Sequence, residues 1–256
     1  MGILADIITP FADGGGMMLL PLTSTLTALL TSGPWPGPRR KYWRSAAGRI
    51  LVVAGTGDLT SKGAVELAVH AAQAGAAAVV VIPPYYEAHI LEETRELLQD
   101  IHTASGLPIV YYNIPSISGL TLSAQNIASL SDVGVKYLKD TSGSAPVLTD
   151  LLFTYGQKIT TFNDWDTLTF YGLAASTKGS IWGAVNIIPE LSAERWNALA
   201  VEDDLKKGRE VWENIFPICM ELRIWKTGGV RKPFAPLKEG PQAELAALLE
   251  TARVKL

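Results

Sequence analysis

The sequence predicts an α/β protein folded as a (β/α)8 barrel. Between Ile50 and Trp182, short apolar segments alternate with segments whose apolar residues recur at helical spacing. The short segments are apolar throughout, which is typical of parallel strands that are covered on both faces. Polar residues follow several of them, as catalytic residues do at the C-terminal ends of barrel strands. The length of 256 residues is also common for one such barrel.

The N-terminal part begins with a predicted strand, Ile3 to Ile8, which ends at Pro10 and a glycine-rich turn. Leu19 to Leu30 carries leucines at helical spacing and is predicted as a helix. Segment 33–38 holds three prolines and cannot form a central strand, because each proline removes a backbone donor. The basic cluster at 39–41 is interpreted as a solvated helix start rather than a nucleic-acid patch.

From residue 50 onward, predicted strands and helices follow one another regularly. The strands are Ile50–Ala54, Ala78–Ile82, Ile109–Tyr112, the segment ending at Lys139, Ile159–Phe162 and Ser180–Trp182. The helices lie around Val65–Ala72, Leu91–Thr103, Ala124–Leu130, Val147–Tyr155 and Leu168–Ala175. We expect a barrel domain at residues 1–200 and a helical extension at residues 201–256 that packs on it.

Composition disfavours several classes of function. The net charge of -3 and the pI near 5.7 give no electrostatic basis for a nucleic-acid or membrane partner. The sequence begins without the pattern of a secretory signal, and no apolar run approaches the roughly 20 residues of a membrane span. Cys219 is the only cysteine, so we expect a reducing, cytoplasmic location. The three histidines are scattered, so we expect no metal site.

A nucleotide site is also disfavoured. Gly14-Gly15-Gly16 follows a predicted strand but lacks the spaced third glycine of a dinucleotide-binding turn. The sequence contains no Walker-type Gly-Lys-Ser/Thr motif. These observations favour a closed barrel over an open, doubly wound sheet.

The segment 135–143 holds the main candidate for catalysis. If Val135, Tyr137 and Lys139 share one strand face, Lys139 is the last inward residue before a polar turn that ends in glycine. Lysine is rarely fully buried, and a desolvated amine can attack a ketone to form a Schiff base. The alternative is a lysine whose amine extends past the strand end into solvent.

Further candidates lie at other predicted strand ends. In a barrel, the phenol of Tyr112 would lie beside Lys139 and could move protons, although an aromatic ring there could also cap the barrel mouth. Thr141 could donate a hydrogen bond to a substrate carboxylate or could cap the next turn. Asp164 and Asp166 resemble paired acids, but Asp-x-Asp on a loop more often serves the turn itself.

Several motifs occur in the order found in one known family. They are Thr9-Pro10-Phe11 with Asp13-Gly14, Pro83-Pro84-Tyr85-Tyr86, Tyr112-Asn113-Ile114-Pro115, Lys139-Asp140-Thr141-Ser142-Gly143, and Gly179-Ser180-Ile181 with Asn186. With these motifs the chain resembles the dihydrodipicolinate synthase/N-acetylneuraminate lyase family, most strongly from residue 50 to about residue 221.

The resemblance implies a (β/α)8 TIM barrel with C-terminal helices, assembled as a homodimer or homotetramer. It implies a cofactor-free class I aldolase or lyase that acts at the methyl carbon of pyruvate. By this likeness Lys139 is the Schiff-base lysine and Tyr112 relays protons. Tyr86 reaches across a subunit interface, and Ile181 lines the pyruvate pocket.

The chain also departs from the family pattern. Nothing in residues 17–49 matches the Gly-Thr-Thr-Gly-Glu loop that ends the family's second strand, so we expect that strand to be missing or distorted. A second shortening lies between Met220 and Val230. Ile117 stands where dihydrodipicolinate synthases carry an arginine, which disfavours a second substrate with a distal carboxylate.

We therefore expect a Schiff-base aldolase or lyase that takes a small 2-oxo acid. It would form or cleave the bond between pyruvate and an aldehyde, as in a 4-hydroxy-2-oxo acid or a 2-keto-3-deoxy sugar acid. The alternative is a catalytically impaired or inactive barrel homologue that lacks the second-strand loop.

Overall fold

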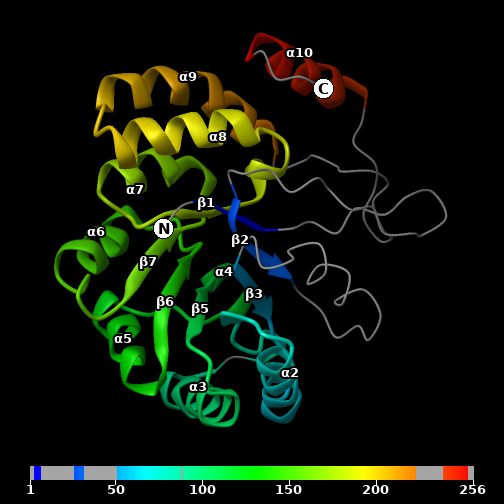
Figure 1. Ribbon diagram of the computed structural model, residues 1–256, viewed down its shortest axis with the longest axis vertical. Coiled ribbons are helices and arrows are strands. Elements are labelled where there is room, and N and C mark those ends of the chain that lie inside the picture. The colour runs from blue at the N-terminus through cyan, green and yellow to red at the C-terminus, as the bar shows by residue number, and fades with distance from the viewer. Residues whose placement is uncertain (1–2, 7–25, 32–50, 88, 223–238, 253–256) are drawn as a thin grey trace.

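The computed structural model describes residues 3–6, 26–31, 51–87, 89–222 and 239–252. Within these residues, parallel strands close into a barrel in sequence order, with β1 paired to both β2 and β8 (Figure 1). The strands are β1 Ile3–Asp6, β2 Leu26–Thr31, β3 Leu51–Gly55, β4 Ala78–Val81, β5 Ile109–Asn113, β6 Val135–Asp140, β7 Thr160–Asn163 and β8 Ser180–Trp182. The predicted parallel barrel is confirmed.

From β3 onward, helices alternate with the strands as predicted. They are α2 Ser61–Gln73, α3 Leu91–Ser105, α4 Pro115–Ser118, α5 Ala124–Ser129, α6 Ala145–Phe153, α7 Thr169–Ala174, α8 Pro189–Trp196, α9 Leu205–Leu222 and α10 Glu239–Thr251. Short turns of other helical types are η1 Leu130–Val133, η2 Asp166–Leu168, η3 Gly183–Asn186 and η4 Asn197–Val201. Among the described helices, none is long and apolar enough to cross a bilayer.

Side-chain caps fix where several helices begin. The Thr60 hydroxyl accepts a hydrogen bond from the Gly63 amide at the start of α2. The Ser144 hydroxyl accepts from the Val147 amide at the start of α6. These caps satisfy amide groups that have no partner inside the helix, and so they help to fix the residue at which each helix begins.

The second strand of the barrel is present. Leu26–Thr31 pairs with β1 on one side and with β3 on the other, so the expectation of a missing strand is wrong, and so is the helix predicted over residues 26–30. A short apolar run fits both periods, and here pairing with two neighbouring strands outweighs the helical spacing. The alternative expectation, a distorted second strand, stays a prediction. Residues 19–25 and 33–38 lie outside the described part of the chain.

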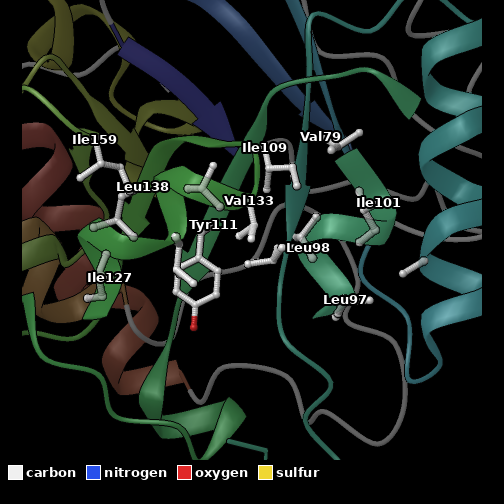
Figure 2. Close-up of a cluster of buried hydrophobic side chains, with 14 of the residues drawn as sticks. Val79, Leu97, Leu98, Ile101, Ile109, Tyr111, Ile127, Val133, Leu138 and Ile159 are labelled. Atoms are coloured by element: carbon white, nitrogen blue, oxygen red, sulfur yellow. The ribbon is translucent and has the colours of Figure 1, made fainter. Parts of the chain in front are cut away.

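Two apolar layers lie on the two faces of the barrel wall. The inner layer consists of strand residues alone: Val53, Ala78, Val80, Val110, Phe162 and Ile181, with Tyr112 and Tyr137 packed against them. The outer layer joins strands to the surrounding helices, and Figure 2 shows Ile109 and Tyr111 of β5 in one cluster with Leu98 and Ile101 of α3. Side chains that alternate along a strand therefore point into the barrel or toward the helices.

A register shift decides the direction of the residues in β6. Ile109 of β5 pairs with Val135, but the next residue, Val110, pairs with Tyr137, so Lys136 is an extra residue in β6. Val135 consequently packs in the outer layer, whereas Tyr137 packs against the inner layer. The expectation that Val135 shares a face with Tyr137 and Lys139 is wrong for this reason.

The C-terminal helices share an apolar cluster with the end of the barrel. Trp182 at the end of β8 and Ala184 in η3 pack with residues of α9 and α10, and Figure 1 shows α8 and α9 lying beyond α7. The cluster includes Ile188, Val211, Ile215, Ile218, Cys219, Leu245 and Leu249. The π-helical turn η4 continues directly from α8 across the expected boundary at residue 200, and that boundary stays a prediction.

We expect the single thiol of the chain to be unreactive in the folded protein. Cys219 is 1% exposed, and burial, followed by the charge of Asp166, raises its pKa to about 12 against the opposing effect of Arg195. At pH 8 a disulfide reagent should modify the native protein about 10³-fold more slowly than the denatured chain, because the reactive species is the thiolate. Rapid stoichiometric labelling of native protein would contradict this burial.

Candidate active site

The ends of β5 and β6 bring Lys139 and Tyr112 together, as predicted. The two residues are partners in the parallel register, and the Lys139 Nζ lies 4.1 Å from the centre of the Tyr112 ring. The Lys139 side chain is only 4% exposed, so the alternative in which its amine extends into solvent is wrong. A buried amine against the face of a phenol is held in one place and is shielded from bulk water.

A carboxylate from the next strand completes this cluster. Asp164 directly follows β7, and its Oδ2 lies 3.4 Å from the Lys139 Nζ, with its side chain 8% exposed. The Tyr112 hydroxyl donates to the same oxygen over 3.4 Å, and the Thr141 hydroxyl also donates to it. The amine, the phenol and the alcohol therefore all contact the same carboxylate oxygen, Asp164 Oδ2.

Backbone pairing continues past the strand ends and positions these side chains. The Thr141 amide donates to the Asn113 carbonyl over 2.9 Å, and the Asp164 amide donates to the Asp140 carbonyl over 2.9 Å. The barrel ladder thus extends by one residue on β6 and on β7. This extension brings Thr141 and Asp164 to the same level of the barrel mouth.

Asp140 organises the turn that follows Lys139. Its Oδ1 accepts from the Asn113 side-chain amide over 2.8 Å and from the Ser142 backbone amide over 3.2 Å, while its Oδ2 accepts from the Ser142 hydroxyl. Burial raises the pKa of Asp140, and the hydrogen bonds from Asn113 and Ser142 act in the opposite direction. Asp140 faces this turn, whereas Lys139 faces the barrel interior, so the two neighbours have separate roles.

Glycine at position 143 allows Trp165 to close over the turn. Gly143 has a φ of +71°, a conformation that favours glycine. A Cβ built at this residue would come within 3.0 Å of the Trp165 indole. Any larger residue would therefore require the indole, which belongs to the same loop as Asp164, to shift by a few tenths of an ångström.

The loop from 163 to 166 is held at both ends. The Asn163 side-chain amide donates to the Trp165 carbonyl over 3.0 Å and to the Thr169 hydroxyl over 3.2 Å. The Trp182 indole N–H donates to Asp166 Oδ1 over 2.6 Å. Since Asp166 is tied to β8 and Asn163 belongs to β7, the Asp164 side chain between them has little freedom to leave Lys139.

The two other predicted site residues differ in their burial. Ile181 is fully buried in the inner layer of the barrel. Tyr86 is 84% exposed, and among the described residues no hydrogen bond or ion pair joins it to Lys139. Tyr86 lines a cavity of about 450 Å³ together with residues of α3, including Glu93, Glu96 and Asp100.

Asp164 is the contact that the sequence prediction missed. The sequence pattern Asp-x-Asp favours turn chemistry, but both carboxylates contact residues far away in the chain, Asp166 the Trp182 indole and Asp164 the Lys139 amine. The available signal for Asp164 was its position directly after a strand that neighbours the Lys139 strand. The Thr141 hydroxyl donates to Asp164, and its binding of a substrate carboxylate stays a prediction.

In the described part of the chain, no three His, Cys, Asp or Glu side chains gather as metal ligands would. The polar groups that converge on the barrel mouth are an amine, a phenol, an alcohol and a carboxylate. Together they can form an imine and move protons around it.

Comparison with known proteins assigns the chain to a family. A model of the dihydrodipicolinate synthetase family matches residues 41–252. The chain belongs to this family. A 4-hydroxy-tetrahydrodipicolinate synthase from Thermomicrobium roseum is 29% identical over 97% of this chain and 93% of its own length. Another, from Methanocaldococcus jannaschii, is 32% identical over 69% of this chain and 61% of its own length.

Solved structures of the dihydrodipicolinate synthetase family share the fold. The Acinetobacter baumannii dihydrodipicolinate synthase, in a complex with pyruvate, superposes with a TM-score of 0.86. It is 21% identical, and the comparison covers 99% of each chain. Enzymes of this family are carbon–carbon lyases of the class I aldolase type, and this membership confirms the resemblance seen in the sequence motifs.

Proposed function

We propose that the chain forms a Schiff base between Lys139 and a 2-oxo acid and thereby makes or breaks a bond between pyruvate and an aldehyde. The observation that carries this proposal is the buried amine at the end of β6, 4.1 Å from the Tyr112 ring centre and 4% exposed. The protonated imine accepts the electron pair that carbon–carbon cleavage releases, and Tyr112 transfers protons.

Trapping with borohydride tests the proposal. Protein is incubated with pyruvate and borohydride, and intact-mass analysis with peptide mapping should find one reduced pyruvate adduct, on Lys139. Protein treated with borohydride alone is the control. Absence of an adduct would reject the enzymatic proposal and would support the second candidate, an inactive barrel homologue. The sequence observation that favours this second candidate is the lack of a Gly-Thr-Thr-Gly-Glu loop.

The aldehyde partner is proposed as a hydroxylated aldehyde without a distal carboxylate. Ile117, in α4 after β5, is 51% exposed and supplies no cation for a second carboxylate. The relatives named above carry the name 4-hydroxy-tetrahydrodipicolinate synthase, so that synthesis is the competing activity. A panel with 4-hydroxy-2-oxoglutarate, 2-keto-3-deoxy sugar acids, N-acetylneuraminate and a 4-hydroxy-tetrahydrodipicolinate synthase assay distinguishes them. Release of pyruvate from a sugar acid is the expected result.

We also propose that the protein is a cytoplasmic homodimer or homotetramer. Large side chains are exposed on the loops after β4 and β5, with Tyr85 at 51%, Tyr86 at 84% and Ile117 at 51%. Exposed apolar and aromatic residues on neighbouring loops are typical of an interaction surface. Light scattering of the purified protein should give a mass of two or four chains, and a monomer would reject this assembly.

A further inference from the structure

The family resemblance assigns no role to Asp164, yet its carboxylate touches the group that reacts. We propose that Asp164 is a catalytic acid–base that takes a proton from Lys139 and returns it to the departing water during imine formation. This inference rests on the proposed function, because it needs Lys139 to be the nucleophile.

The geometry places Asp164 at the two positions where protons must move. Its Oδ2 is 3.4 Å from the Lys139 Nζ, and it accepts a hydrogen bond from the Tyr112 hydroxyl over 3.4 Å. The amine nitrogen and the phenol are the two groups through which protons enter and leave a carbinolamine. A carboxylate in contact with both can exchange protons with either group without bulk water.

Burial makes this pair more than a surface ion pair. The Lys139 and Asp164 side chains are 4% and 8% exposed. Desolvation disfavours the charged form of both groups, so the neutral pair of an amine and a carboxylic acid becomes accessible inside the barrel. The neutral amine is the nucleophile that imine formation requires.

The substrate strengthens this tendency. A 2-oxo acid carries its carboxylate on the carbon next to the ketone, so attack by the Lys139 Nζ brings a second negative charge close to Asp164. Two adjacent carboxylates in a buried site favour a state in which one of them holds a proton. Binding of the substrate therefore pulls a proton from the ammonium to Asp164.

The resulting sequence balances. The ammonium of Lys139 gives one proton to Asp164, and the neutral amine forms a bond to the ketone carbon. The Tyr112 phenol moves a second amine proton to the former carbonyl oxygen and is itself regenerated. Asp164 then gives its proton to that hydroxyl, the carbon–oxygen bond breaks, and water leaves. The nitrogen keeps its third proton as the protonated imine.

The surrounding loop fits this role. The hydrogen bond from the Trp182 indole to Asp166 and the bonds from the Asn163 side chain hold the chain on both sides of Asp164. A residue that exchanges a proton twice in one cycle must stay at a constant distance from the reacting nitrogen.

A competing role for Asp164 is that of a placeholder, in which its carboxylate occupies the position of the substrate carboxylate and is displaced when the substrate binds.

Rapid-quench trapping tests the inference. Protein is mixed with pyruvate, quenched with borohydride after increasing times, and the adduct is quantified by intact mass. In an Asp164→Asn variant, imine formation should slow by about 10²- to 10⁴-fold, with the adduct still on Lys139. In an Asp164→Ala variant, added formate should restore much of the lost rate, because it supplies a carboxylate that can exchange protons.

The control variant is Asp132→Asn, the same chemical change at a side chain that is 67% exposed. It should trap at the rate of the unmodified protein. Melting temperatures of all variants verify folding, and formate rescue itself requires a folded site.

The outcomes separate the hypotheses. Slow trapping in Asp164→Asn together with formate rescue of Asp164→Ala supports the inference. Unchanged trapping, or saturation at lower pyruvate concentration, overturns it in favour of the placeholder role. Slow trapping without rescue also overturns it, since the loss then reflects the shape of the site. Failure of the unmodified protein to form an adduct rejects the proposed function and this inference together.

Discussion

A Lys139→Arg variant is expected to lose pyruvate-forming activity by on the order of 10⁴-fold or more and to give no borohydride adduct. Arginine keeps a cation beside Asp164, whose Oδ2 lies 3.4 Å from the Lys139 Nζ, so the buried carboxylate remains paired. The guanidinium stays protonated and does not form an imine. The loss should therefore be chemical, and the melting temperature should change much less than the activity.

Lys136→Arg is the matched control for this experiment. Lys136 lies on the same strand, three residues earlier, and is exposed. The same substitution there should leave the rate and the adduct unchanged. An adduct in Lys139→Arg, or retained turnover, would show that another amine is the nucleophile.

An Arg195→Met variant is expected to be more stable than the unmodified protein, by about 1–4 kcal/mol at pH 7. Arg195 in α8 is fully buried, and within the described residues none of its Nε, Nη1 and Nη2 atoms has a hydrogen-bond partner. Its guanidinium lies 4.1 Å from the Trp182 ring and 5.6 Å from the Trp212 ring. Cation–π contacts offset only part of the cost of burying a charge.

The stability gain of Arg195→Met should depend on pH in a definite direction. Burial lowers the pKa of Arg195 to about 9, with an opposing effect from Cys219. As the pH rises, Arg195 loses its proton at a lower pH in the folded state than in the unfolded state. The free-energy cost of its buried charge is therefore fully present below pH 9 and declines as the pH rises above 9. Urea unfolding should show that the difference in free energy of unfolding between Arg195→Met and the unmodified protein is smaller at pH 10 than at pH 7.

Arg209→Met provides the comparison for Arg195→Met. Arg209 is exposed on α9, and its replacement should change stability by no more than about 0.5 kcal/mol. A destabilised Arg195→Met protein would mean that the two indoles and the guanidinium stabilise the fold as a stack. A gap that does not depend on pH would mean that charge burial is not the cause.

The sequence predicted the parts of the site that depend on topology. Parallel strands end at one edge of a barrel, so Lys139 and Tyr112 on successive strands had to meet, and they do. The strands from β3 to β8 could also be located, because their mostly apolar composition differs from that of the helices between them.

Features that depend on a partner strand could not be predicted in this way. The helical spacing of leucines near Leu26 is present, but pairing with β1 and β3 makes Leu26–Thr31 a strand. The contact of Asp164 with Lys139 depends on the loop geometry that Trp182 and Gly143 impose. Local patterns do not contain that geometry, because it is set by residues far away in the chain.

The extra residue in β6 has a consequence for how this barrel could change. Because Lys136 is the extra residue, its removal would leave a regular ladder in which Val135 still pairs with Ile109 and Lys139 still pairs with Tyr112. Removal of Leu138 would instead pair Lys139 with Tyr111, whose side chain packs in the outer layer, so the amine would turn toward the helices. Deletion of the exposed residue is thus expected to leave the direction of the amine unchanged, whereas deletion of a buried aliphatic residue two positions further along would turn the amine out of the barrel.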